Sequence, residues 1–233
     1  ILQISLIDTW AATTSGAYVL TENTLYTVEA WQTFLNRLSP TGILSVSRWY
    51  FQDRPGEVYR LAALARASLE QLGIQDPRKH ILILRRMREV KKGDPDGLGT
   101  LMVSKTPFSS EDLAKIRRVA DQMDFDLILT PTVAVDPTFE ALVSSPDLEA
   151  FASTYPLDIS PPTDNSPFFF HMLRLRDVLN PEMWNQGHAS FNMKAVVLLA
   201  VLLATVIGLT CLCIIIPLLL TTEKNTLKGA GPL

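Results

Sequence analysis

The stretch "HILILRRMREVKKGDPDGLGTLMVSK" (residues 80–105) holds two apolar runs joined by a connection too short for a crossover helix. The runs 80–86 and 100–105 have the length and composition of β-strands. Gly, Asp and Pro residues in the connection (91–99) are typical of a turn, and strands joined in this way pair antiparallel. We therefore expect an antiparallel hairpin late in the fold.

Upstream of this hairpin, strands and helices alternate along the chain. The run "ILQISLI" (1–7) predicts a strand buried on both faces, and "ILSVSR" (43–48) predicts a second buried strand. Apolar residues at helical spacing predict helices over 25–38 and from Val58 to Leu72, the second closed by Gly73. Alternating elements of this kind predict a three-layer α/β fold.

Downstream of the hairpin the elements become shorter. Ser109 and Asp112 resemble a capping box, which predicts a helix from there to about Met123. The run "DLILT" (126–130) predicts a short strand. The proline-punctuated stretch 131–167 predicts loops with short helices and contains no recognisable catalytic spacing.

The region 195–220 contains no charged residue and exceeds the roughly 20 residues that a helix needs to cross a bilayer. It predicts one membrane-spanning helix, bent near Pro217. Both cysteines, Cys211 and Cys213, lie inside it and read as small apolar packing residues. Its position near the C-terminal end of the sequence excludes a signal peptide.

Composition excludes some classes of function. With 47% hydrophobic residues and a net charge of -3, the chain is neither disordered nor suited to coat nucleic acid. The three histidines are scattered without ligand spacing, so no metal site is expected. The basic stretch "RRMREVKK" (85–92) suits phosphate or an anionic membrane surface, or simply a solvated strand end.

Asp8 follows the first strand directly and precedes a loop of mostly small residues. One interpretation is a turn, because an Asp side chain accepts hydrogen bonds from backbone amides two residues on. The other is a functional site, because ligands of open α/β sheets bind beyond the carboxyl ends of the strands.

The residues 2–50, "LQISLIDTWAATTSGAYVLTENTLYTVEAWQTFLNRLSPTGILSVSRWY", resemble the middle of the spermidine synthase (polyamine aminopropyltransferase) domain. The stretch "TDNSPFFFHMLRLRD" (163–177) directly before an apolar span resembles the large bacterial membrane-embedded subgroup. The resemblance implies the C-terminal half of a Rossmann-like S-adenosylmethionine-dependent transferase sheet, with a late antiparallel hairpin, followed by a transmembrane helix.

The resemblance also implies roles for single residues. Asp8 falls on the acidic residue that orients and deprotonates the attacking amine, which makes it the catalytic candidate. Ser5 falls on the family's first acidic position and Thr9 on its proline, so the family's acidic pair is incomplete here and putrescine is in doubt as the substrate. Glu22 and Tyr26 are candidate substrate-binding helpers, with an exposed loop acid and a packed helix-start aromatic as the alternatives.

The implied reaction transfers an aminopropyl group from decarboxylated S-adenosylmethionine to a small-molecule amine. The family's glycine-rich turn and ribose-binding acid belong to the first half of such a domain, so we read this chain as a fragment that binds no nucleotide cofactor by itself. Two alternatives remain: an S-adenosylmethionine-dependent methyltransferase, and a non-catalytic membrane transporter or scaffold that carries a synthase-like domain.

Four segments follow from these predictions: a partial synthase-like domain over 1–160, a membrane-proximal segment over 161–192, a transmembrane helix over 193–221, and a polar loop over 222–233 that leads to a possible further span. Within the second segment, 168–179 predicts either an interfacial helix or a helix that covers the sheet edge.

The implied location is the bacterial inner membrane, with several spans in the full-length protein. Basic residues lie on both sides of the span, before it at Arg174, Arg176 and Lys194 and after it at Lys224 and Lys228, so the positive-inside rule gives no clear orientation. A co-substrate made in the cytosol favours a cytoplasmic soluble domain.

Overall fold

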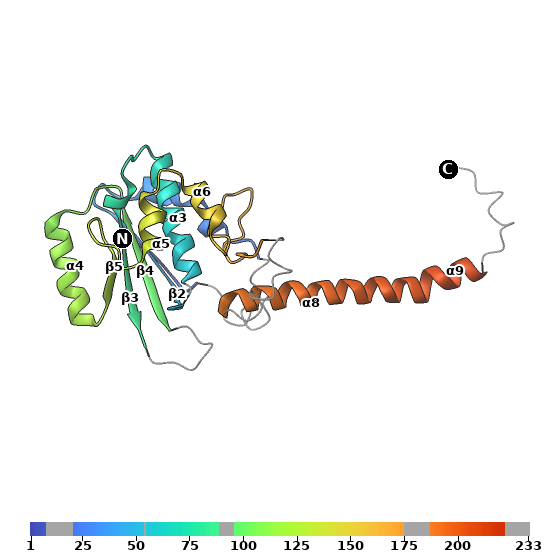
Figure 1. Cartoon of the computed structure of the whole chain (residues 1–233). Coiled ribbons are helices and arrows are strands. Elements are labelled where there is room, and N and C mark those ends of the chain that lie inside the picture. Colours follow the sequence, from blue (N-terminus) through green and yellow to red (C-terminus); the bar gives the residue numbers. More distant parts are fainter. Residues whose placement is uncertain (8–20, 54, 89–95, 175–186, 222–233) are drawn as a thin grey trace. The chain divides into compact units, whose positions relative to one another are not determined.

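The structure is a computed structural model, and it describes residues 1–7, 21–53, 55–88, 96–174 and 187–221, the side chains of 187–196 and 221 excepted. The chain divides into two compact units, Ile1–Met193 and Lys194–Leu233 (Figure 1). The first unit is an α/β domain, and the described part of the second is helical.

The α/β unit is built on a mixed five-stranded sheet. Its strands are β1 (Leu2–Ser5), β2 (Ile43–Tyr50), β3 (Ile81–Met87), β4 (Gly97–Ser104) and β5 (Asp126–Leu129). Their order across the sheet is β1-β2-β4-β3-β5. β1 runs parallel to β2, whereas β4 runs antiparallel to both β2 and β3, and β5 runs antiparallel to β3.

The antiparallel hairpin predicted from residues 80–105 is confirmed as β3 and β4. Its register pairs Ile81 with Val103 and Met87 with Gly97. The second strand of the hairpin does not extend the sheet but lies between β2 and β3, with eight residues paired to β2 from Ile43–Ser104 to Tyr50–Gly97. The hairpin is therefore in the centre of the sheet.

The predicted helices are also confirmed. They are α2 (Val28–Arg37), preceded by the 3₁₀ turn η2 (Thr24–Tyr26), α3 (Gly56–Gln71), α4 (Ser110–Met123), α5 (Pro137–Ser144) and α6 (Leu148–Thr154). A further 3₁₀ turn, η3 (Pro77–His80), leads into β3. Gly73 ends α3 with φ of 83°, a left-handed conformation that favours glycine, and Ser109 and Asp112 form the expected capping box of α4.

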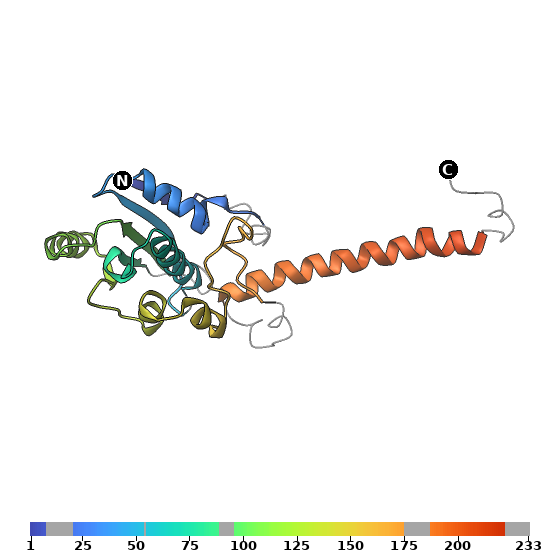
Figure 2. The same ribbon diagram turned by 90° about the horizontal axis from the view of Figure 1, so that it is seen from above.

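The two faces of the sheet are covered differently. One face, called here the inner face, packs against α3, because Gly99 of β4 approaches Val58 so closely that a Cβ atom would lie 2.8 Å from a valine methyl group. Helices α2 and α5 pack beside α3. The opposite, outer face is approached by α4 (Figure 2), of which Ala120 is the one fully buried residue.

The prediction that the first strand is buried on both faces is wrong for the described sheet. β1 is one of the two edge strands of the described sheet, and only Ile4 among its residues is buried, while Gln3 and Ser5 are exposed. The apolar run signalled a strand correctly, but composition alone cannot tell an edge strand from a central one.

The predicted helix over 168–179 is also wrong in its described part. Residues 168–174 are not helical, and the segment packs into the α/β unit with buried apolar side chains at Phe169, Phe170, Met172 and Leu173. Phe169 stacks on Tyr26 with ring centroids 4.5 Å apart, so the aromatic residues of this segment belong to the core of the α/β unit.

The helix α8 (Gly187–Thr210) begins in the last residues of the first unit and continues into the second. The second unit also contains a π-helical turn at Cys211–Ile215 and α9 (Ile216–Thr221). The stretch Val197–Leu220 has a mean hydropathy of 2.9 and is long and apolar enough to span a membrane. The π-helical turn ends two residues before Pro217, where the ring crowds the carbonyl four residues earlier and no N–H is available to bond it. The bend predicted near this proline stays a prediction.

Candidate functional site: an acidic hollow at the start of α2

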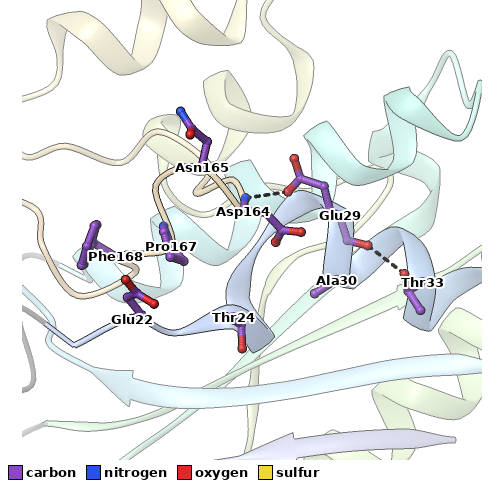
Figure 3. Close-up of a pocket in the computed structure, with 9 residues that line it drawn as sticks. All are labelled: Glu22, Thr24, Glu29, Ala30, Thr33, Asp164, Asn165, Pro167 and Phe168. Carbon is purple, nitrogen blue, oxygen red and sulfur yellow. Dashed lines mark hydrogen bonds between the residues drawn. The ribbon is translucent and has the colours of Figure 1, made fainter.

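A hollow of about 430 Å³ lies beside the N-terminal end of α2 (Figure 3). Its walls come from two segments far apart in the sequence, residues 22–33 and the turn 164–168. The lining residues are Glu22, Thr24, Glu29, Ala30, Thr33, Asp164, Asn165, Pro167 and Phe168. Because α2 connects the parallel strands β1 and β2, its first turn lies toward the carboxyl ends of those strands, where α/β sheets bind ligands.

Thr27 joins the two walls while it caps α2. Its hydroxyl oxygen accepts a hydrogen bond from the backbone N–H of Ala30 at 3.2 Å, the usual role of a threonine N-cap. The same hydroxyl donates to Oδ1 of Asp164 at 2.6 Å, across 137 positions of sequence. One side chain thus starts the helix and fixes the opposite carboxylate.

Backbone hydrogen bonds hold the second wall against the first. The N–H of Val28 donates to the carbonyl of Pro162 at 3.0 Å, and the N–H of Asn23 donates to the carbonyl of Pro167 at 2.6 Å. Oε2 of Glu29 accepts from the backbone N–H of Asp164 at 3.0 Å, as Figure 3 shows. The turn is therefore fixed at both ends and in its middle.

The hollow is acidic. Three of its lining residues, Glu22, Glu29 and Asp164, carry carboxylates, and none of the nine is Lys, Arg or His. Within the described part of the chain, no ion pair or hydrogen bond engages the side chain of Glu22, and one oxygen each of Glu29 and Asp164 is bonded. Carboxylate oxygens of this kind are suited to accept hydrogen bonds from an ammonium group.

A buried polar cluster lies next to Tyr26, the last residue of the 3₁₀ turn η2 that precedes α2. Nε of Arg48 donates to Oε2 of Glu57 at 2.8 Å, and both side chains are nearly fully buried. Arg48 also donates to the hydroxyl of Tyr26 at 3.3 Å and lies over the ring of Phe170, 4.6 Å from its centroid. Partnered on several sides, the guanidinium stabilises the junction of β2, α3 and the 168–174 segment.

The structure brings only some of the expected site residues to the hollow. Glu22 lines the hollow, as a substrate-binding residue would. Tyr26 is fully buried and belongs to the packed cluster with Arg48, which matches the alternative of a packed aromatic. Ser5 is exposed at the end of β1 opposite Ser47 and does not line the hollow. Asp8 and Thr9 lie outside the described residues.

Glu29 and Asp164 are site residues that the sequence reasoning missed. Glu29 looked like an ordinary acid in the first turn of a helix, a position that the helix dipole favours. Asp164 lies in the stretch 163–177, whose resemblance indicates a subgroup of the family and no site residue. The signal that could have found it is the turn sequence "TDNSP" (163–167), which exposes a carboxylate on a short loop.

In the described residues, no group of three or more His, Cys, Asp or Glu side chains is arranged to hold a metal ion. Comparison with known protein families, with curated proteins and with solved structures finds no match for this chain. The sequence resemblance and the geometry of the hollow are therefore the two observations that bear on function.

Proposed function

We propose that this chain is part of an aminopropyltransferase-like membrane protein, which transfers an aminopropyl group from decarboxylated S-adenosylmethionine to a small-molecule amine. The observation that carries the proposal is the acidic hollow at the start of α2. A cationic amine is the ligand class that three carboxylates without a neighbouring cation attract. Glu22, Glu29 and Asp164 are its proposed ligands.

The topology of the sheet supports the same proposal. The resemblance implies a parallel sheet that ends in a late antiparallel hairpin, and β4 is antiparallel between two strands, β2 and β3, that run in the same direction. The helix α2 then has its N-terminal end toward the carboxyl end of β1, the strand that the resemblance associates with the amine site.

In the proposed reaction the amine nitrogen forms a bond to the carbon next to the sulfonium, while the carbon–sulfur bond breaks and its electron pair stays on sulfur. The amine binds most readily as an ammonium ion but attacks only when neutral. Carboxylates of the hollow hold the cation, and Asp8 accepts its proton. Alignment of the two substrates supplies much of the remaining acceleration.

The co-substrate is not assigned to residues of this chain. The resemblance places the glycine-rich turn and the ribose-binding acid in the first half of such a domain, so the proposal concerns the amine side alone. The experiment therefore uses the full-length protein, with transfer from decarboxylated S-adenosylmethionine to a panel of mono- and diamines as the readout.

We expect Asp8→Asn to lower turnover about 10²- to 10⁴-fold, the range for loss of a general base. Glu29→Gln and Asp164→Asn should raise the KM for the amine, because they remove charge from the hollow and leave its shape. Glu111→Gln, an exposed acid of α4 that does not line the hollow, is the control. Absence of transfer to every amine, with S-adenosylmethionine also tested as a methyl donor, would favour the non-catalytic alternative.

We further propose that Val197–Leu220 spans the bacterial inner membrane, with the α/β unit in the cytoplasm and further spans in the full-length protein. The support is the length and hydropathy of this helix together with the cytosolic origin of the co-substrate. A topology reporter fused after Leu220 should be active on the periplasmic side. Cytoplasmic activity of the reporter would contradict the orientation.

A further inference from the structure

We propose that Arg60 is a positioning residue, which sets the affinity of the acidic hollow by tying together the two ends of the loop that carries Asp164. The inference depends on the proposed amine site for its functional consequence. Arg60 lies on α3 and does not line the hollow, so it acts only through the loop.

The hydrogen bonds of Arg60 reach both ends of this loop. Nε donates to the carbonyl of Ser160 at 2.8 Å, before the turn, and Nη1 donates to the carbonyl of Phe168 at 3.0 Å, after it. Nη1 also approaches the carbonyls of Phe169 at 2.7 Å and His171 at 2.8 Å. The planar guanidinium thus closes a loop of nine residues, 160–168, from the inside.

Arg60 is itself held in place. It is 5% exposed, and Asp158 lies 3.7 Å from Nη2 as its carboxylate partner. Burial lowers the pKa of Arg60 to about 10, opposed by the charge of Asp158, so the side chain remains charged at neutral pH. A buried cation with several carbonyl acceptors is costly to misplace, which makes it a rigid anchor.

The loop transmits this constraint to the hollow. Between its tied ends it carries Asp164, Asn165, Pro167 and Phe168, four of the nine lining residues. Its outer side is fixed to α2 by Thr27 and Glu29. Weakening the hydrogen bonds of Arg60 should therefore move Asp164 relative to Glu22 and Glu29 without removing any of these carboxylates.

Arg66 provides a matched control on the same helix. It is also 5% exposed and donates to the carbonyl of Leu142 and to Oγ of Ser145, both at 3.1 Å, and to Glu70. Its partners hold the end of α5 and the connection to α6, away from the hollow. Arg60→Lys and Arg66→Lys each keep the charge and lose the planar fork, so they should destabilise the domain similarly.

The test uses the full chain in detergent, well below its unfolding temperature, with the panel of mono- and diamines, 1,4-diaminobutane among them, as probes in titration calorimetry. Arg60→Lys should weaken binding about tenfold, equivalent to about 1.4 kcal/mol, and Arg66→Lys should leave it within about twofold. Asp164→Asn should weaken binding by itself, and Arg60→Lys added to it should cost little more, because both changes act through one carboxylate.

Amide hydrogen exchange of peptides covering 161–168 gives a readout that needs no ligand. Exchange there should speed up in Arg60→Lys and stay unchanged in Arg66→Lys. If Arg60→Lys does not fold, Asp158→Asn, which removes the partner charge of Arg60, should act in the same direction with a smaller effect.

Unchanged exchange at 161–168 in the Arg60 variant, or equal loss of amine binding in the Arg60 and Arg66 variants, would overturn the inference. Additive losses from Arg60→Lys and Asp164→Asn would also overturn it. A wild-type chain that binds none of the mono- and diamines of the panel, while exchange responds as expected, would overturn the proposed function and leave Arg60 as the residue that positions the loop.

Discussion

Arginine side chains on the two sides of the sheet differ in their burial and in their ion-pair partners. On the inner side, Arg48, Arg60 and Arg66 are buried, and each has a carboxylate partner. On the outer side, Arg86 and Arg88 are exposed and lie over the rings of Phe125 and Trp49. Among the described residues, neither of these two guanidinium groups has an ion-pair partner.

The difference follows from what each face must hold. The segment 156–174 crosses the inner side without regular secondary structure, so its carbonyl groups need donors from elsewhere. Buried arginines supply them, and their charges in turn need carboxylates. The outer face has α4 along it and an open, mostly apolar hollow of about 360 Å³ between α4 and the strands, so its cations remain in water.

The largest effect should come from breaking a buried ion pair on the inner side. Glu57→Gln leaves Arg48 buried without its charge partner, and we expect the free energy of unfolding to fall by about 3 kcal/mol. Urea denaturation of the detergent-solubilised chain measures it. Glu111→Gln on the outer side is the matched control, because the ion pair of Glu111 with Lys115 is largely exposed. It should lower the free energy of unfolding by about 0.5 kcal/mol or less. Equal losses would show that the two faces do not differ in this respect.

Gly99→Ala should have the next largest effect. The added Cβ would lie 2.8 Å from a methyl group of Val58 and 3.2 Å from the ring of Tyr50. Because the inner face is already filled, overpacking should cost about 1–3 kcal/mol in urea denaturation. Ser45→Thr adds one carbon to the opposite face, where it borders the open hollow, and it should change stability by about 0.5 kcal/mol or less. A neutral Gly99→Ala would mean that α3 can move away from the sheet.

The sequence predicted what depends on nearby residues. Helical spacing, the capping box at Ser109 and the left-handed Gly73 are local signals, and the elements that they predicted are present. The pairing of β3 with β4 is also local, because the nine residues between Met87 and Gly97 are too few for the crossover helix that a parallel pair needs.

What the sequence did not predict depends on contacts between distant residues. The sequence near β4 does not specify that this strand lies between β2 and β3. Its position depends on the packing of the whole sheet. The aromatic run 168–170 predicted a helix. Instead, Arg60, 108 positions before Phe168, donates hydrogen bonds to the carbonyl groups of Phe168 and Phe169. Likewise, the two walls of the hollow are joined by the hydrogen bond from Thr27 to Asp164, 137 positions later in the chain. The sequence near neither residue predicts this contact.

A smaller effect is expected from the cap of α4. With a single fully buried residue, α4 depends on its own ends more than the inner helices do. Ser109→Ala removes the hydroxyl that accepts from the N–H of Asp112, and we expect a loss of about 1 kcal/mol. Ser110→Ala, one residue further on, is the control and should be nearly neutral. Faster amide exchange confined to α4 would confirm that the outer face opens separately, whereas uniform exchange would contradict it.

The smallest effect concerns pH and returns to the inner side. Burial lowers the pKa of His171 below its ordinary value of 6.5, and the charge of Arg60 lowers it further, while Asp158 opposes both. The folded chain therefore binds a proton at this ring less readily than the unfolded chain does. Stability from this residue is complete above pH 6.5 and is lost as the pH falls from there through the folded pKa.

His171→Gln should flatten this dependence. We expect the free energy of unfolding of the wild-type chain to fall more steeply than that of the variant as the pH falls below 6.5, with the curves parallel above that pH. Taking the difference between the two curves cancels every other titrating group. A His171→Gln curve parallel to the wild type throughout would mean that the ring titrates alike in the folded and unfolded chain. Since Arg60 is one cause of the lowered pKa, Arg60→Met should reduce the same slope, which connects the buried arginine to a measurable proton uptake.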